Sequence, residues 1–143
     1  MNHINYTYET CEKDIKEIVK RIKIIEQERG FKFINVYPIK RGGYYLGLRL
    51  SELLGIPIIH NLGKVNKTKT IISEDIVDTG KTLYGLRKCF VVCLHYKSQS
   101  KFVPRLYVNK INTYDWMHYF WEEGNVALET EQSVKLLKKY NKR

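Results

Sequence analysis

The stretch TIISEDIVDTGKTL, residues 70–83, joins two carboxylates to a loop rich in phosphate-binding groups. Glu74 and Asp75 are the residue types that bind vicinal hydroxyls or a hydrated Mg²⁺, which prefers oxygen ligands. The loop after them offers hydroxyl donors, a glycine that admits close backbone approach, and the unsatisfied N–H groups of a helix start. This loop consists of Asp78, Thr79, Gly80, Lys81 and Thr82. A ribose 5-phosphate satisfies both halves of the stretch.

The ending TGKT also invites comparison with an ATP-binding loop. A Walker A loop needs the pattern G-x-x-x-x-G-K-[ST], whose leading glycine lets backbone N–H groups wrap the phosphates. That glycine would be residue 75, which is Asp75 here. A carboxylate at this point repels a triphosphate, so the sequence argues against a P-loop nucleoside triphosphatase. An ordinary strand–turn–helix with a capping Asp78 remains the structural alternative.

The apolar patterns around this stretch predict the elements that position it. Isoleucines at helical spacing predict an amphipathic helix that ends near Gly30, and further helices are expected over 44–54, 80–88 and 129–140. Apolar, β-branched runs predict strands at 31–39, 56–59, 70–73, 90–96 and 105–109.

Strands that alternate with helices indicate an α/β fold: a single domain over residues 1–143, with a mostly parallel central sheet flanked by helices on both faces. In such sheets, ligands bind beyond the carboxyl ends of the strands. The segments KRGG, EDIVDTGKT, HYKSQSK and WMHYFWEE all follow predicted strands on that edge. The sequence therefore predicts one site built from these four segments.

Composition limits the class of protein. The 143 residues carry 25 Lys and Arg against 15 Asp and Glu, a formal charge of +10. Such a charge indicates phosphorylated small molecules or nucleic acid as binding partners, or a contribution to solubility alone. No apolar run is long enough for a membrane helix, and the N-terminal segment has no apolar h-region, so a cytoplasmic protein is expected. Three unpaired cysteines and four scattered histidines show no disulfide framework or zinc spacing.

The segment IISEDIVDTGKTL resembles the phosphoribosyl-diphosphate (PRPP) signature of type I phosphoribosyltransferases. Upstream, YPIKRGGYYLGLRLSELLGIPI resembles the diphosphate loop of that family. The resemblance implies that Lys40, Arg41, Gly42 and Gly43 bind diphosphate, through a forked guanidinium and backbone N–H groups. It also implies a non-proline cis peptide at Lys40-Arg41.

Downstream, the chain most closely resembles the bacterial xanthine-guanine branch of the family. The resemblance implies that Lys97 donates to the exocyclic oxygen of a purine, that Trp116 stacks on the base, and that Met117 offers backbone groups to the base edge. Glu122 stands where the family has an Asp beside a tryptophan, here Trp121. Asp75 and Glu122 are the implied ligands of Mg²⁺. The alternatives are that Lys97 is a surface lysine, that Trp116 belongs to the core or to an interface, and that Glu122 is solvated.

The implied function is purine salvage: transfer of the ribose 5-phosphate of PRPP to guanine, xanthine or hypoxanthine, with Mg²⁺ as cofactor. Glu74, Asp75 and Asp78 are the candidate catalytic residues, with Asp78 handling the proton at N7 of the purine. A homodimer or homotetramer is expected from the family, and nucleic acid is not an expected partner.

Only ten residues, 60–69, separate two predicted strands where active relatives carry a longer hood over the substrate. Two alternatives therefore remain open: a phosphoribosyltransferase with a different acceptor, and a PRPP- or nucleotide-binding regulator that binds nucleic acid.

Overall fold

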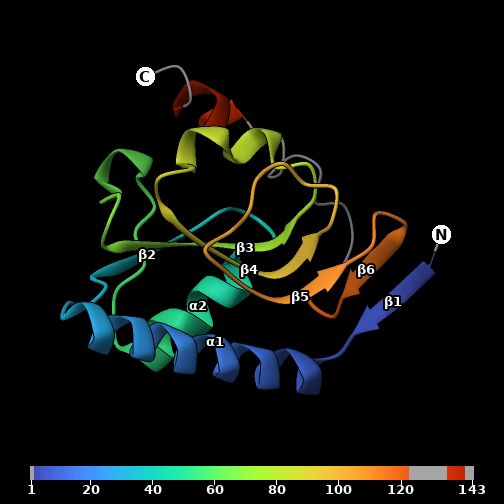
Figure 1. The fold of residues 1–143 in the computed structure, drawn as a ribbon, viewed down its shortest axis with the longest axis horizontal. Helices are drawn as coiled ribbons and strands as arrows, with labels where there is room; N and C mark the ends of the chain where they lie inside the picture. The colour runs from blue at the N-terminus through green and yellow to red at the C-terminus, as the bar shows by residue number, and fades with distance from the viewer. Residues whose placement is uncertain (1, 123–134, 141–143) are drawn as a thin grey trace.

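A parallel sheet forms the centre of the computed structural model, which describes residues 2–122 and 135–140 (Figure 1). Four strands pair in the order β2-β3-β4-β5, and every pair is parallel. The strands are β2 (Asn35–Pro38), β3 (Thr70–Val77), β4 (Phe90–Lys97) and β5 (Leu106–Ile111). Strand β4 lies inside the sheet and is buried over its whole length, which explains its unbroken apolar run.

Two long helices cover one face of this sheet (Figure 1). Helix α1 (Tyr8–Arg29) begins at Thr7, whose hydroxyl accepts a hydrogen bond from the N–H of Thr10, and it ends at Gly30 in the left-handed conformation. Helix α2 (Tyr44–Leu54) has the bounds predicted from the sequence and ends at Gly55, also left-handed. Isoleucines of α1 and leucines of α2 pack into one hydrophobic cluster with β3 and β4.

The opposite face carries shorter helical segments. These are η1 (Leu62–Lys64), η2 (Lys81–Leu86) and the helical residues 135–140. A second hydrophobic cluster lies between them and the sheet, and includes Leu83, Leu86 and Leu137. The predicted fold class, a mostly parallel sheet with helices on both faces, is confirmed. Residues 129–134 of the predicted C-terminal helix lie outside the described residues.

A second, two-stranded sheet was not predicted. Strand β1 (Asn2–Tyr6) pairs in parallel with β6 (Asp115–Tyr119), so the segment expected to be a loop around Trp116 is a strand. Met117 and Tyr119 point into the core while Trp116 and His118 stay exposed, which is the alternation of a half-buried strand. The two partners are more than 100 residues apart, so neither strand is evident from its own short sequence.

Three further expectations were wrong. Residues 56–59 form a single bridge, Val36 to Ile58, instead of a strand. Strand β3 runs on to Val77, so the acidic pair, which was expected at the very end of the strand, lies within it. The helix predicted over 80–88 is the short 3₁₀ segment η2, which starts after Gly80 in the left-handed conformation and contains Gly85. Within the described residues, no helix is long and apolar enough to cross a membrane.

Candidate functional site

The carboxyl edge of the sheet brings the predicted segments together. The loop 40–43 follows β2, the acidic pair lies near the end of β3, the loop 78–82 follows β3, and Lys97 ends β4. Because β2, β3 and β4 are adjacent and parallel, these segments share one edge. The peptide bond between Lys40 and Arg41 is cis, as predicted.

The loop 40–43 lies directly against β3. The N–H of Ile39 donates to the carbonyl oxygen of Ser73, and the hydroxyl of Ser73 donates to the carbonyl oxygen of Gly43 at 2.8 Å. A Cβ on Gly42 would lie 2.3 Å from Oδ2 of Asp75, and one on Gly43 would lie 2.1 Å from the Ser73 carbonyl oxygen. The two glycines therefore allow the loop to sit against the carboxylate of Asp75.

A cleft of about 240 Å³ opens between this loop, β3 and the segment after β6. It is lined by both cations and carboxylates, so it matches a ligand that has an anionic group beside hydroxyls or a metal ion. Its lining consists of Lys40, Arg41, Gly42, Glu74, Asp75, Ile76, Trp121 and Glu122. Six of these eight were predicted as site residues, although they come from three distant parts of the sequence.

The carboxyl groups of the cleft hold their protons more tightly than usual. Burial raises the pKa of Glu74 well above its ordinary value, and the neighbouring Asp75 raises it further. Burial also raises the pKa of Asp75, although the N–H of Ile76 donates to its Oδ1 at 2.7 Å. Burial and then Asp75 raise the pKa of Glu122, while His118 and Arg41 oppose that rise. Crowded carboxylates of this kind favour a cationic ligand.

The fit of these residues to Mg²⁺ depends on what the substrate supplies. In the part of the chain that the structure describes, no three His, Cys, Asp or Glu side chains gather as a metal cage. Mg²⁺ is usually bound by one or two carboxylates and by phosphates of the substrate, so Asp75 and Glu122 across a cleft suit a substrate-borne ion.

The loop 78–82 forms the second part of the site. Asp78 is half exposed; its Oδ2 lies 3.6 Å from Nζ of Lys97, and its Oδ1 accepts a hydrogen bond from Gln99 at 2.9 Å. Gly80 has φ 77°, and a Cβ there would lie 2.3 Å from Cβ of Phe102. Thr79 and Lys81 contribute exposed side chains. Since η2 is short, the N–H groups and hydroxyls of the loop itself, including Thr82, are what a phosphate would meet.

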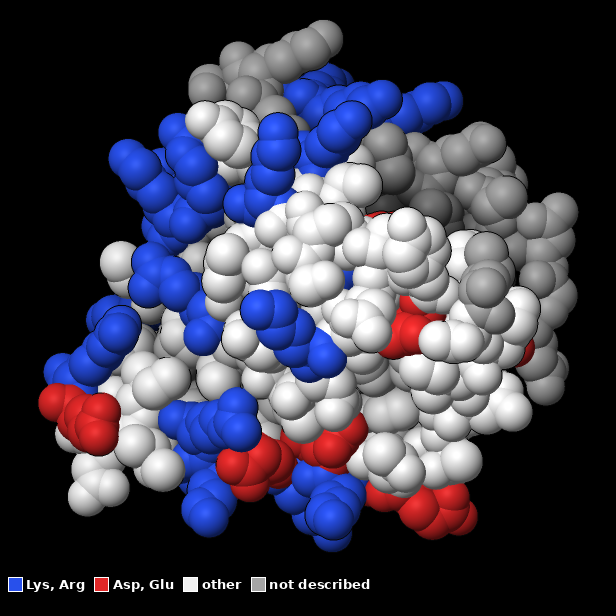
Figure 2. Space-filling model, turned by 45° about the vertical axis from the view of Figure 1, so that its right-hand side comes forward, with Lys and Arg blue, Asp and Glu red and all other residues white. Residues whose placement is uncertain are grey.

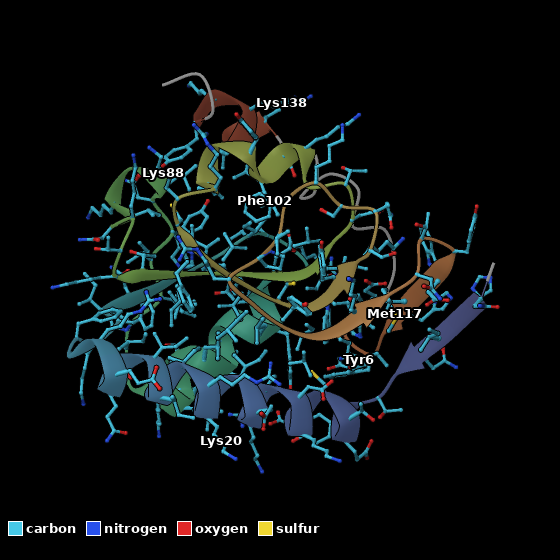
Figure 3. All side chains as sticks on the ribbon, in the orientation of Figure 1. Tyr6, Lys20, Lys88, Phe102, Met117 and Lys138 are labelled. Carbon is cyan, nitrogen blue, oxygen red and sulfur yellow. The ribbon has the colours of Figure 1, made fainter. Side chains whose placement is uncertain are left out.

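The residues predicted to bind a purine do not lie together in the structure. Lys97 is buried, and Asp78 is its only ion-pair partner among the described residues. Trp116 is 51% exposed on β6 and does not line the cleft. Met117 is buried in the core near Tyr6 (Figure 3). Lys97 therefore joins the loop 78–82, whereas Trp116 and Met117 lie on opposite faces of a separate strand.

An aromatic stack that the sequence did not reveal closes one side of the cleft. The ring of Trp121 is stacked between Tyr45, at 5.1 Å, and Tyr119, at 4.6 Å. Nε1 of Trp121 is buried and has no hydrogen-bond partner among the described residues. Such an N–H is costly unless it is paired, and it belongs to a ring that lines the cleft.

Two further residues support this stack. Glu12 accepts hydrogen bonds from the hydroxyl of Tyr45 and, in a forked pair, from Arg49. The hydroxyl of Tyr119 lies 2.9 Å from Nδ1 of His95 and donates to the carbonyl oxygen of Asp75 at 3.4 Å. Burial lowers the pKa of His95 to about 4, so it is neutral at pH 7. Together with Gln99, these residues escaped the sequence analysis because the hydrogen-bond partners described above are 21 to 44 residues away in the chain.

Several solved structures share this fold. A purine phosphoribosyltransferase from Pyrococcus horikoshii matches at 23% identity and TM-score 0.68, over 88% of this chain and 97% of that chain. The xanthine-guanine-hypoxanthine phosphoribosyltransferase of Helicobacter pylori matches at 24% identity and TM-score 0.68, over 92% and 99%. A Neisseria gonorrhoeae protein with bound ppGpp matches at 20% identity and TM-score 0.64, over 96% and 97%.

No protein-family model and no curated protein sequence matches this chain. At these identities the structural matches establish the fold. The chain has the fold of the type I phosphoribosyltransferases, as the sequence resemblance implied.

Proposed function

We propose that this chain is a purine phosphoribosyltransferase that transfers the ribose 5-phosphate of PRPP to a six-oxopurine and releases diphosphate. One observation carries the proposal: Lys40 and Arg41 line the same cleft as the partly buried Glu74 and the buried Asp75. PRPP has this same juxtaposition, with a diphosphate attached to the anomeric carbon of a sugar that bears two hydroxyls.

The two ends of PRPP are assigned to two parts of the edge. Arg41, Lys40 and the N–H groups of Gly42 and Gly43 bind the diphosphate. Thr79, Lys81 and Thr82 bind the 5-phosphate with the backbone of their loop. Glu74 and Asp75 lie between these segments on β3, where they accept hydrogen bonds from the ribose hydroxyls. Bound Mg²⁺ would neutralise the leaving diphosphate, with Asp75 and Glu122 as its protein ligands.

The transfer breaks the bond between the anomeric carbon and the diphosphate oxygen, and forms a bond from that carbon to N9 of the purine. Positive charge builds on the ribose as the diphosphate leaves, and the carboxylates of Glu74 and Asp75 favour it. The purine must lose a proton when N9 attacks. Asp78, half exposed at the loop, takes up the proton at N7.

Lys97 selects the base. Its ammonium group is buried at the end of β4, beside Asp78, and can donate but cannot accept. It therefore matches the exocyclic oxygen of guanine, hypoxanthine or xanthine and opposes the amino group of adenine. Trp116 is the proposed stacking residue, and Met117 the proposed backbone contact.

A phosphoribosyltransferase with another acceptor is the second candidate. It is favoured by the position of Trp116, which is half exposed on β6 instead of lining the cleft. The short connection over 60–69 does not argue against transfer, because this chain spans 97% and 99% of the two phosphoribosyltransferases named above.

Diphosphate release from PRPP and Mg²⁺ with each of guanine, hypoxanthine, xanthine, adenine and uracil tests the proposal. We expect release with the six-oxopurines and a rate at least about tenfold lower with adenine, since a missing hydrogen bond costs at least that much. A preference for adenine would contradict the role of Lys97. Release with uracil alone would favour the second candidate, and no release with any base would contradict transfer.

A further inference from the structure

The positive charge of the chain is concentrated in one stretch of sequence. Between Glu52 and Asp115 there are ten Lys and Arg residues and three acids. The three acids are Glu74, Asp75 and Asp78, all of which belong to the site described above. Outside that site, the stretch has no acidic residue to balance its cations. The proposed transfer uses Lys81 and Lys97 of this set and leaves the others without a role.

The fold gathers many of these unused cations on the face that carries η1 and η2. Arg87 lines a hollow with Lys101, and it also lines a neighbouring hollow with Lys67 and Lys88. Lys67 and Arg105 both act on Cys89, where burial raises the pKa of the thiol and these two cations oppose the rise. We call Lys67, Arg87, Lys88, Lys101 and Arg105 the basic face. All five are exposed, and none forms an ion pair with a described residue.

The other side of the sheet is electrically balanced. Helix α1 has six acidic and six basic residues, and Arg21 pairs with Glu17 at 3.1 Å. Figure 3 places Lys88 and Lys138 on one side of the sheet and Lys20 of α1 on the other (Figure 3). In Figure 2, Lys and Arg cover the upper left of the molecule, while Asp and Glu lie among basic residues along the lower edge (Figure 2). The excess positive charge therefore lies on the side of the sheet that carries η1 and η2.

The basic face is hollowed and carries an aromatic ring. The two hollows have volumes of about 720 Å³ and 450 Å³, and they meet at Arg87. Tyr84 is 64% exposed at the first hollow, and the guanidinium carbon of Arg87 lies 4.4 Å from the centre of its ring. Volumes of this size admit a planar ring with its attached groups. An anionic membrane offers no such units, and a run of acidic side chains offers no flat ring for Tyr84.

We propose that the basic face binds single-stranded nucleic acid, with its phosphates on Lys67, Arg87, Lys88, Lys101 and Arg105 and a base stacked on Tyr84. A positively charged groove with exposed aromatic rings is the arrangement by which proteins follow a single strand without reading its sequence. The five cations and Tyr84 lie outside the cleft and have no role in the proposed transfer. The first hollow is also lined by Thr79, Gly80 and Lys81 of the 5-phosphate loop, so the two proposed sites are neighbours.

Fluorescence anisotropy with labelled oligo(U) and oligo(dT) of about 12 nucleotides tests the proposal. The test variant carries the charge reversals Lys67→Glu, Lys88→Glu and Arg105→Glu. The native side chains at these positions make no hydrogen bond or ion pair with a described residue. The matched control reverses Lys13→Glu, Lys16→Glu and Lys20→Glu on α1, which are equally exposed. Each triple change lowers the formal charge from +10 to +4. Thermal unfolding and diphosphate release from PRPP are recorded for both.

We expect wild-type affinity to fall roughly a hundredfold between about 50 and 200 mM salt, as five phosphate contacts require. The test variant loses at least about tenfold in affinity at low salt, and its slope of log affinity against log salt is shallower by about 2. The control variant keeps most of both. Equal losses in the two variants, or the absence of binding by wild type at low salt, would overturn the proposal.

The ring is tested separately. Tyr84→Ala loses about fivefold or more in affinity, since stacking of one base on an aromatic ring has about that effect. Tyr8→Ala, which removes a similarly exposed tyrosine from α1, changes little. Equal effects of the two changes would overturn the stacking. Oligo(U) and oligo(dT) distinguish RNA from DNA as the source of the strand. Poly-glutamate or phosphatidylserine vesicles that compete as well as the oligonucleotides, at equal charge, would assign the face to another partner.

Discussion

Asp78 has two possible roles, which only a functional measurement distinguishes. As a cap it would order its loop, and as a base it would move a proton. The structure places its carboxylate at the open end of the site, between Lys97 and Gln99, where either role is open to it. A change that preserves shape and hydrogen bonding but removes the charge separates the two.

Asp78→Asn keeps an oxygen that can accept the hydrogen bond from Gln99 and removes the base. We expect kcat to fall by about 10²–10⁴-fold, the usual contribution of general acid–base catalysis, while the affinity for PRPP changes little. Single-turnover diphosphate release and PRPP titration measure the two quantities. An unchanged kcat would rule out the catalytic role, and a matched loss of PRPP affinity would indicate the cap.

Glu74 and Asp75 affect the stability of the unliganded protein. Their pKa values are raised in the folded chain, chiefly by burial, so the folded state holds protons that the unfolded state releases above about pH 4. The stability that follows from these protons is fully present below that pH. It is lost as the pH rises through the raised folded values. At neutral pH the pair therefore destabilises the unliganded protein.

Asp75→Asn should accordingly raise the free energy of unfolding at pH 7, by roughly 1 kcal/mol, and the gain should shrink as the pH falls toward 4. The gain is measured as the difference between variant and wild type in urea unfolding at several pH values, since Glu12 titrates in the opposite sense. Glu28→Gln on the exposed surface of α1 is the control and should show no such trend. A variant less stable than wild type at pH 7 would contradict the argument.

At the scale of elements, the diphosphate loop depends on how closely α2 approaches β3. Gly47, in the second turn of α2, lies so near the sheet that a Cβ would stand 2.6 Å from Oγ of Ser73 and 2.9 Å from Cβ of Pro38. The same hydroxyl of Ser73 donates to the carbonyl oxygen of Gly43. The packing of the helix and the shape of the loop therefore share one side chain.

Gly47→Ala places two effects in opposition. Alanine favours an isolated helix by about 1 kcal/mol, whereas overpacking usually costs about 1–3 kcal/mol. We expect overpacking to win, with lower stability and a raised KM for PRPP because Ser73 is displaced from the loop. Urea unfolding and steady-state kinetics measure both. The neighbouring Leu48→Ala, on the exposed side of α2, should leave KM unchanged; a stable Gly47→Ala with normal KM would refute the coupling.

At the scale of the molecule, the main hydrophobic core and the candidate site lie at different parts of the sheet. The face under α1 and α2 holds most of the larger hydrophobic cluster, and the carboxyl edge holds the crowded carboxyl groups. A ligand that neutralises those groups binds only the folded state, so it stabilises the whole chain.

PRPP with Mg²⁺ should therefore raise the thermal midpoint, and PRPP with excess EDTA should raise it much less. At about 100 times the dissociation constant, the expected stabilisation is roughly 2.7 kcal/mol. Ribose 5-phosphate, which lacks the diphosphate, is the control and should stabilise less. Equal midpoints with and without the chelator would contradict the proposed use of Mg²⁺ at Asp75 and Glu122.

Local patterns were enough to predict a large part of this protein. The spacing of isoleucines and a terminal glycine defined α1, and the apolar runs defined the parallel strands. The acidic pair and the glycine loop were identified because a run of a few residues already contains the groups that a sugar phosphate requires. Their convergence on one edge followed from the order of strands and helices alone.

Only the tertiary structure decided the rest. The pairing of β1 with β6, the stack of Tyr45, Trp121 and Tyr119, and the collection of cations on the basic face all join residues far apart in the chain. Periodicity and spacing describe neighbours within a turn or a strand, and they carry no information about which distant segments meet. These contacts are determined by the packing of the entire core, because burial of apolar area stabilises the chain as a whole and not any one segment.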